Sequence, residues 1–466
     1  MAVGGGALLL PPRARLLYIG PPKTGTTAVQ EAARAARSTL YQHGVYYPGR
    51  RRNHRREIYA LLGQPYQVLQ RAAGERAAPG ATPEQAMWTP PPSEWRALMA
   101  DIQAEDTRRI LISHEAAAGA SDEVAERFVR ELGRDRIHVA ISLRSLASVI
   151  PSWWNELVKS GPIEPFERVL ERLYGRSEPP VSPVVRQYFD QGGLVERWAR
   201  AAGPDHVTVI IADPSNKSLL PEAFERMLAL PAGTLSGANH GGFRTNRSLT
   251  RTEAELFRQV NAAIPDPAQM SWPVHAQVLQ SGAIAAILDG RVPDVDEPRI
   301  LMPRWAADLA LRDGREHADR IARSGARVVG DLTALYAQPA TADDAPTVGA
   351  DIPMAIAVQA LLGALDGATR CEHDTAASAR RVHTQLRRAH TQLRTARARL
   401  RRSRERERAL RARTVRDLLD ALPAGAAAAT AAESFRTRDL ARAVLIRVAR
   451  RLRFRRADPA APTSTG

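Results

Sequence analysis

Cysteine, lysine and long apolar runs are scarce in this chain of 466 residues. Cys371 is the only cysteine, so the chain cannot form an intrachain disulfide and does not require an oxidising compartment. No apolar run approaches the roughly 20 residues that cross a bilayer. The first residues show neither the positive start nor the cleavage site of a signal peptide. Together these absences predict a cytoplasmic protein.

The shortage of lysine makes the existing ones informative. Of 66 basic residues only three are lysines, namely Lys23, Lys159 and Lys217, and the other 63 are arginines. Lys23 falls in the sequence Gly-Pro-Pro-Lys-Thr-Gly-Thr-Thr, between an apolar run that predicts a strand and a sequence of helical composition. Strand, glycine-bearing turn and helix aim free backbone N–H groups at a phosphate. In so arginine-rich a chain, a lysine in this turn indicates a need for a compact ammonium.

The order of residues in this turn differs from a Walker A loop, which has the form G-x-x-x-x-G-K-[ST]. Gly20 and Gly25 have the Walker separation, but Thr26 stands where the Walker lysine belongs, and the lysine lies inside the turn at position 23. We expect the turn to bind a nucleotide phosphate. The residues predicted to do so are Lys23, Thr24, Gly25, Thr26 and Thr27. A glycine-rich turn with no ligand is the alternative.

Strands and helices alternate along the first three quarters of the chain. Short apolar runs at 109–113, 138–143 and 206–212 are typical of buried parallel strands, and helical patterns follow at 122–132 and 221–230. The alternation predicts a doubly wound parallel α/β sheet flanked by helices. The predicted parts are an α/β domain (1–337), a linker with a short helix (338–369), a basic helix or short coiled coil (370–420), an Ala-rich flexible linker (421–432), a basic amphipathic helix (433–457) and a disordered tail (458–466).

The positive charge is confined to this C-terminal extension. The net charge of the chain is +16, and residues 370–466 carry 25 arginines against 9 acidic residues, so the preceding part is neutral. Heptad-spaced apolar residues at 382–410 favour a homodimer, but the arginines beside them would repel one another, and a solvated single helix remains equally open. The helix at 433–457 suits peripheral contact with an anionic membrane, here the inner face of the membrane. Nucleic acid is disfavoured because no aromatic stacking platform accompanies the arginines.

A second motif lies about 120 residues after the lysine turn. Arg144 follows the predicted strand at 138–143, and Ser152 comes eight residues later. The turn and this R-x7-S spacing together resemble the bacterial sulfotransferases that use 3′-phosphoadenosine 5′-phosphosulfate (PAPS), over about residues 16–261. The resemblance implies a P-loop-like fold. It also implies that Lys23 reaches the bridging oxygen of PAPS and that Arg144 and Ser152 hold its 3′-phosphate.

The same resemblance implies the remaining parts of the site. A third loop over the 3′-phosphate would use Arg244 or Arg247, and Trp153 and Trp154 could flank the adenine, with core packing as the alternative. The base for the acceptor hydroxyl would be Glu115, favoured over His114, at the end of the predicted strand 109–113. PAPS would be a co-substrate, and no metal is expected because no cluster has metal-ligand spacing.

The predicted function is transfer of a sulfuryl group from PAPS to an acceptor hydroxyl on a glycan, a glycolipid or a natural product. Two alternatives stay open. One is a P-loop kinase or NTPase, although the chain lacks a lysine after Gly25 and a clear acidic magnesium ligand at a strand end. The other is a non-catalytic scaffold that acts through its basic tail.

Overall fold

The structure is a computed structural model, and most of the chain is described by it. The described residues are 8–64, 89–161, 163–213, 215–237, 247–264, 272–341 and 352–420. The chain divides into two units, residues 1–375 and residues 376–466, and each is described by itself.

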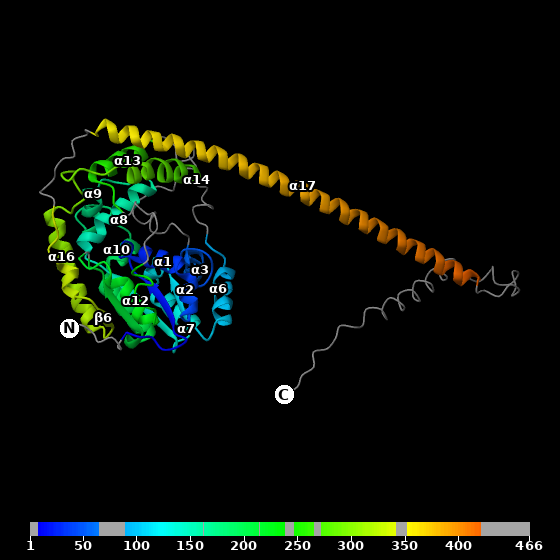
Figure 1. Cartoon of the computed structure of the whole chain (residues 1–466), viewed down its shortest axis with the longest axis horizontal. Helices are drawn as coiled ribbons and strands as arrows, with labels where there is room; N and C mark the ends of the chain where they lie inside the picture. Colours follow the sequence, from blue (N-terminus) through cyan, green and yellow to red (C-terminus); the bar gives the residue numbers. More distant parts are fainter. Residues whose placement is uncertain are drawn as a thin grey trace. The chain divides into compact units, whose positions relative to one another are not determined.

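The centre of the first unit is a sheet of six parallel strands in the order β2-β3-β1-β4-β5-β6 (Figure 1). The strands are β1 (Arg15–Ile19), β2 (Val45–Tyr46), β3 (Arg109–Ser113), β4 (Ile137–Leu143), β5 (Val207–Ile211) and β6 (Arg327–Val329). The predicted parallel α/β sheet is confirmed, and all four runs predicted as strands are present. β2 has only two residues, too few for an apolar pattern to reveal it.

Helices cover both faces of the sheet, because successive side chains of a strand point to opposite faces. Leu16 and Tyr18 of β1 pack with one set of helices, whereas Leu17 and Ile19 pack with another. The first set is α1 (Thr26–Ala35), α2 (Arg37–Gln42) and α12 (Leu219–Leu228). The second set is α3 (Arg55–Leu62), α6 (Pro92–Ala104), α7 (Asp122–Leu132) and α11 (Gln191–Ala202), with the short η1 (Glu115–Gly119), η2 (Pro204–His206) and η4 (Leu332–Tyr336) in the connections.

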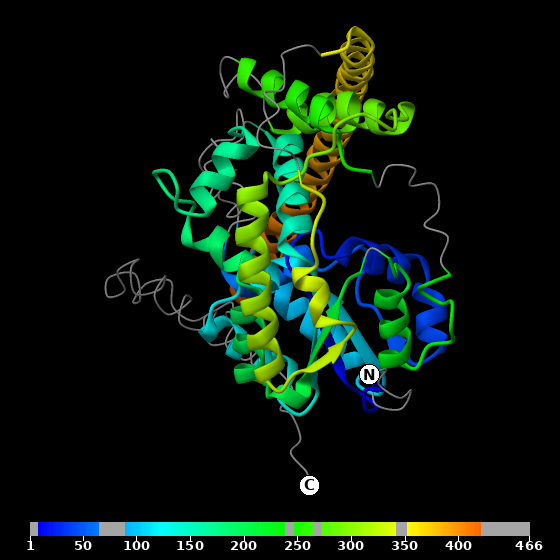
Figure 2. The same ribbon diagram turned by 90° about the vertical axis from the view of Figure 1, so that its left-hand side faces the viewer.

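A further helical layer has its own apolar core, beyond the carboxyl end of β4 (Figure 2). Its members are α8 (Leu146–Ser160), α9 (Phe166–Leu173), α10 (Pro183–Phe189), α13 (Arg251–Ala263), α14 (Trp272–His275), the π-helical η3 (Ala276–Ile284), α15 (Ala285–Gly290) and α16 (Arg304–Arg323). A capping box starts α13: the Thr250 hydroxyl accepts a hydrogen bond from the Glu253 backbone N–H, and the Glu253 carboxylate accepts one from the Thr250 backbone N–H. Since α8 starts directly after β4, this layer stands at the edge where the strands end.

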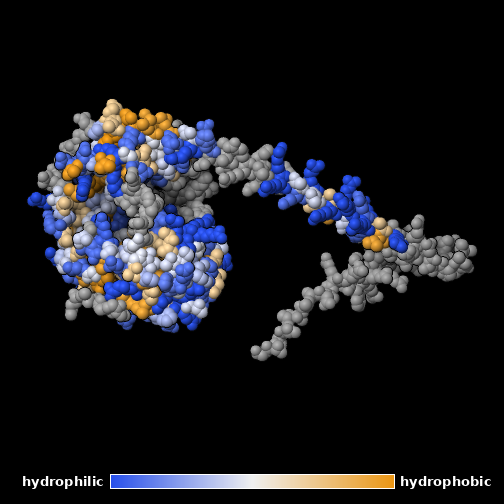
Figure 3. Space-filling view, in the orientation of Figure 1, coloured by the Kyte–Doolittle hydropathy of each residue, from blue (hydrophilic) through white to orange (hydrophobic). Residues whose placement is uncertain are grey.

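One long helix, α17 (Met354–Asp420), covers most of the described C-terminal part. It begins inside the segment predicted as a linker and runs through position 370, where the sequence predicted a separate basic helix. Its first turns expose an apolar face, which Figure 3 shows as apolar side chains over the start of the helix. The exposed members are Met354, Val358, Leu361, Leu362 and Leu365.

The extension predicted beyond this helix, at 421–466, lies outside the described residues. Among the helices that the structure does describe, none has the length and apolarity to cross a membrane.

Candidate functional site

The lysine turn lies against β4. Gly20 directly follows β1, and a Cβ at this position would come within 2.5 Å of the Ser142 Oγ and 2.7 Å of the Thr24 Oγ1. A Cβ atom essentially never comes this close to another heavy atom, so glycine allows the chain to turn this close to the neighbouring strand. The first glycine of the turn is therefore required by packing against β4.

Three buried hydroxyl groups, joined by hydrogen bonds, hold the lysine turn in place. The Tyr18 O–H donates to the Ser142 Oγ at 3.0 Å, and the Ser142 and Thr24 hydroxyls are 2.9 Å apart. Because the Thr24 hydroxyl donates to the Pro21 carbonyl at 2.8 Å, Ser142 is the donor to Thr24. Thr24 is only 1% exposed, so its side chain is used inside the protein and could offer a ligand only its backbone N–H.

Two residues of the turn have left-handed backbone conformations. Gly25, the N-cap of α1, has φ 102°, and Lys23 has φ 70°, which is uncommon for a residue with a Cβ. No side chain caps α1 and no acidic residue lies in its first turn. The first N–H groups of α1 are thus left for an anion, with the Thr26 hydroxyl buried and Thr27 exposed beside them.

Lys23 and Lys159 contact the same carboxylate. The Glu156 Oε1 on α8 lies 2.9 Å from the Lys23 Nζ and 2.8 Å from the Lys159 Nζ. Two of the three lysines of the chain therefore meet at one point, although 133 and 3 residues separate them from Glu156. The arrangement places a second compact ammonium beside the lysine turn.

The two ammonium groups control the ionisation of Glu156. Burial favours the neutral acid, but Lys159 and Lys23 outweigh it and lower the pKa of Glu156 to about 2. The carboxylate is therefore ionised near neutral pH. Its side chain is 44% exposed, so a stronger anion can reach this position and compete for both lysines.

Arg144 lies at the wall of a cavity of about 610 Å³. The cavity lies between the start of α8 and the segments around 247–250 and 293–301, and Ser152 and Asn155 also line it. Burial lowers the pKa of Arg144, and its buried Nε has no hydrogen-bond partner among the described residues. The Ser152 hydroxyl donates to the Ser148 carbonyl at 2.9 Å and keeps its lone pairs for a further donor. The Arg144 guanidinium therefore lines a cavity and has at least one N–H group that is not used in a hydrogen bond.

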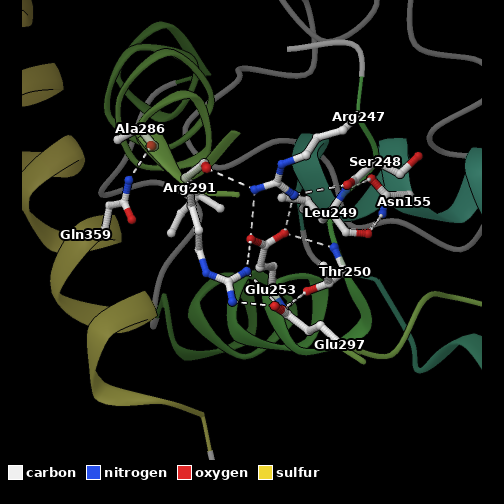
Figure 4. A network of polar contacts seen from close by, with 11 residues as sticks. Asn155, Arg247, Ser248, Leu249, Thr250, Glu253, Ala286, Arg291, Glu297 and Gln359 are labelled. Atoms are coloured by element: carbon white, nitrogen blue, oxygen red, sulfur yellow. Dashed lines mark hydrogen bonds and ion pairs between the residues drawn. The ribbon is translucent and has the colours of Figure 1, made fainter. Parts of the chain in front are cut away.

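Arg247 also lines this cavity but is held by other residues. Its guanidinium donates two hydrogen bonds to Glu253, at 2.7 and 2.9 Å, and a third to the Ile287 carbonyl at 2.9 Å. Glu253 is fully buried, and Arg291 contacts it from the other side at 2.7 Å, as Figure 4 shows. The buried Nε of Arg247, like that of Arg144, has no hydrogen-bond partner among the described residues, so one N–H of Arg247 is left for a ligand. Arg244 lies outside the described residues.

His114 and Glu115 follow β3, on the other side of β1 from β4. Adjacent residues of an extended segment point apart, yet the His114 Nε2 is 3.5 Å from the Glu115 Oε1. The reason is that η1 begins at Glu115 and turns the chain back. The His114 Nδ1 accepts from the Ala116 N–H, so the proton of the neutral ring lies on Nε2 and faces Glu115.

The side chains of His114 and Glu115 differ in solvent exposure and in the direction of their pKa shifts from what burial alone would give. The His114 side chain is 5% exposed, whereas that of Glu115 is 33% exposed. Burial lowers the pKa of His114. Burial acts to raise the pKa of Glu115, but His114, the backbone of Glu115 and a hydrogen bond from Gln30 together lower it. Glu115 is accordingly an ionised, reachable carboxylate, and His114 supports it from within the protein.

Other predicted residues have structural roles. Trp153 and Trp154 are 5% and 3% exposed in the core of the helical layer, which is the packing alternative that the sequence left open. Among the described residues there is no group of three or more His, Cys, Asp or Glu side chains that could hold a metal ion.

Sequence reasoning did not find Glu156 and Lys159 as site residues. The scarcity of lysine was the available signal for Lys159, since it is one of three in the chain. Helical spacing places Glu156 one turn after Ser152, on the same face of α8. Comparison with family models, with curated proteins and with solved structures found no match to this chain.

Proposed function

We propose that this protein is a sulfotransferase that moves a sulfuryl group from PAPS to an acceptor hydroxyl. The observation that carries the proposal is the placement of cations on two neighbouring strands. Lys23 follows β1, and Arg144, with its unpartnered buried Nε, follows β4. Ligands of parallel α/β sheets bind at the carboxyl edge, where the strand order reverses, and β1 lies at such a point between β3 and β4.

The residues present fit the two ends of this nucleotide. The uncapped N-terminus of α1 and Lys23 suit the 5′-phosphosulfate, and Arg144 with the Ser152 hydroxyl suits the 3′-phosphate. A P-loop-like fold is part of the proposal, with the lysine placed inside the turn rather than after its last glycine.

The proposed chemistry needs one base and one cation. Glu115 takes the proton of the acceptor hydroxyl while the new O–S bond forms, and His114 holds the carboxylate in place. Lys23 neutralises the charge that develops on the phosphate oxygen as the S–O bond to the nucleotide breaks. Before the nucleotide binds, Glu156 balances the charges of Lys23 and Lys159, and the phosphates then displace it.

Binding of adenosine 3′,5′-bisphosphate tests the proposal, because this product carries both phosphates. We expect micromolar or tighter binding in the presence of EDTA, and a loss of at least about tenfold in Arg144→Ala, since a charge-assisted fork to phosphate is lost. Calorimetric titration measures both. Turnover of Mg-ATP without binding of the bisphosphate would instead support a kinase or NTPase.

Transfer of labelled sulfate from PAPS into a cell extract tests catalysis itself. Retention of this activity after deletion of residues 376–466 is expected, because every site residue named above lies in the first unit. Loss of all activity with intact nucleotide binding would favour the scaffold alternative.

A further inference from the structure

One face of α8 carries polar side chains along the second half of the helix. Ser152, Glu156 and Lys159 follow one another at spacings of four and three residues, so their side chains lie on the same face. These three residues are partly exposed, and every residue between them is buried. The polar face of α8 therefore begins at the cavity that Ser152 lines and ends beside the lysine turn, which Glu156 contacts.

The length of this polar face matches that of the proposed nucleotide. Lys159 comes seven residues after Ser152, which corresponds to roughly 10 Å along a helix. A similar length separates the 3′-phosphate of PAPS from its sulfuryl group. With the 3′-phosphate at Ser152, as proposed above, the phosphosulfate reaches Lys159 at the end of α8 as well as the lysine turn.

One carboxylate oxygen occupies the point between the two lysines. The Glu156 Oε1 accepts a hydrogen bond from the Lys23 Nζ at 2.9 Å and another from the Lys159 Nζ at 2.8 Å. The two ammonium groups thus converge on a single oxygen atom rather than on the two oxygens of the carboxylate. The oxygen that links phosphorus and sulfur in PAPS is also a single atom, and it gains negative charge as its bond to sulfur breaks.

The carbonyl groups at the end of α8 are bound by amide side chains from other helices. The Gln280 Nε2 donates to the Lys159 carbonyl at 3.0 Å. The Asn261 Nδ2 donates to the Val158 and Gly161 carbonyls at 2.8 and 3.1 Å. A lysine in the last turn of a helix often binds these terminal carbonyls itself. Here the amides do so, and the Lys159 ammonium group is used in the ion pair beside the lysine turn.

We propose, on the basis of the sulfotransferase function above, that Lys159 is a second catalytic residue, which binds the leaving oxygen of PAPS together with Lys23. When the nucleotide binds, Glu156 moves away and the leaving oxygen takes the place of its Oε1. The S–O bond breaks with both electrons on this oxygen, while sulfur bonds to the acceptor oxygen and the acceptor proton goes to Glu115. Two ammonium groups stabilise the resulting negative charge more than one does.

Two nucleotides that differ at the 5′ position test this contact without an acceptor. Adenosine 3′,5′-bisphosphate carries the leaving oxygen, and adenosine 3′-monophosphate lacks it. Both are titrated calorimetrically into the full-length protein. Lys159→Ala should weaken binding of the bisphosphate roughly fivefold, because one of two ammonium contacts is lost, and should leave the affinity for the monophosphate unchanged.

An exposed arginine in the last turn of α7 provides the matched control. Arg130 also ends a helix, but α7 leads into the start of β4, so this residue lies at the opposite edge of the sheet from the site. Arg130→Ala should bind both nucleotides like the wild type. Glu156→Gln should bind the bisphosphate more tightly than the wild type, because a neutral amide competes less with the phosphate for the two ammonium groups.

The two nucleotides also distinguish a catalytic contact from a structural one. An equal loss of affinity for both nucleotides in Lys159→Ala would mean that Lys159 only supports the fold of α8. An unchanged preference for the bisphosphate would mean that it only forms an ion pair within the helix. Either result overturns the inference, as does weaker binding of the bisphosphate by Glu156→Gln.

Transfer of labelled sulfate separates this inference from the function on which it rests. At saturating PAPS, Lys159→Ala should lower the rate roughly 10²-fold, because the charge on the leaving oxygen loses one of its two cations. A wild-type protein that transfers sulfate no faster than Lys159→Ala overturns only the role of Lys159. A wild-type protein that does not bind the bisphosphate overturns the proposed function as well.

Discussion

The carboxylates of Glu156 and Glu253 each contact two basic side chains, but they differ in burial and in the type of cation. Glu253 is fully buried and receives Arg247 and Arg291, whose guanidinium forks also bond to other groups. Glu156 is 44% exposed and receives two lysines. The planar fork suits a permanent buried pair, whereas a flexible ammonium can exchange one anion for another. We infer that the arginines hold Glu253 in a permanent structural ion pair, whereas the lysines hold Glu156 in an ion pair that another anion can displace.

The largest expected difference between the two carboxylates is in folding stability. Glu253→Gln should lower the free energy of unfolding by roughly 3–5 kcal/mol, because buried guanidinium groups lose their counter-charge. Glu156→Gln should lower it by less than about 1 kcal/mol, as is typical of exposed pairs. Urea unfolding of both variants measures this, and equal losses would break the comparison.

The lysine pair, which contributes little to folding stability, should contribute strongly to the rate of sulfate transfer. Lys23→Ala is expected to reduce kcat for sulfate transfer roughly 10²–10³-fold, because charge on the leaving oxygen loses its neighbouring cation. The affinity for adenosine 3′,5′-bisphosphate should fall only a few-fold. Steady-state rates and calorimetry check the two quantities. An equal loss in both would mean that Lys23 only positions the nucleotide.

Exchange of the two cation types sharpens the comparison. Arg291→Lys should destabilise the fold by roughly 1–2 kcal/mol, since one ammonium replaces two nitrogens, of which Nη1 contacts Glu253 and Glu297 and Nη2 makes a second contact to Glu297. Lys23→Arg keeps the charge and should leave stability nearly unchanged while it slows turnover. Thermal unfolding and rate measurements on both variants provide the check. An Arg291→Lys protein as stable as the wild type would contradict the role assigned to the fork.

The smallest expected effect is a dependence of stability on pH at Glu156. Its pKa in the fold is about 2, below the value of about 4.3 in an unfolded chain. The carboxylate therefore contributes fully above about pH 5, and its contribution is lost as the pH falls toward 2. Urea unfolding at pH 7 and pH 3 should show a slightly smaller decrease for Glu156→Gln than for the wild type. An identical decrease would argue against the ion pair.

Local patterns were sufficient for the main elements of the fold. Apolar runs predicted β1, β3, β4 and β5, because a strand that is buried on both faces consists mostly of apolar residues. The two-residue β2 left no such pattern. The long α17 was predicted in pieces, since a change in composition near position 370 does not interrupt a helix.

The sequence predicted those residues of the candidate site that directly follow a strand. Lys23, Arg144 and Glu115 follow strands, where a linear motif marks them. The environments of these residues depend on contacts across the fold: Glu156 lies 133 residues from Lys23, and Arg247 is held by groups from α13 and α15. The sequence could not show that Glu253 and the Ile287 carbonyl hold two of the Arg247 nitrogens, and the ligand contact of Arg247 stays a prediction.

The sequence by itself determined four of the six strands, the glycine turn with its displaced lysine and the difference in charge between a neutral body and a basic extension. These features depend on apolar periodicity, backbone conformation and charge, which act locally along the chain. Only the tertiary structure decided that two of the three lysines share Glu156 and that the His114 ring lies beside the Glu115 carboxylate. These contacts depend on how distant segments of the chain pack together, so local sequence patterns do not predict them.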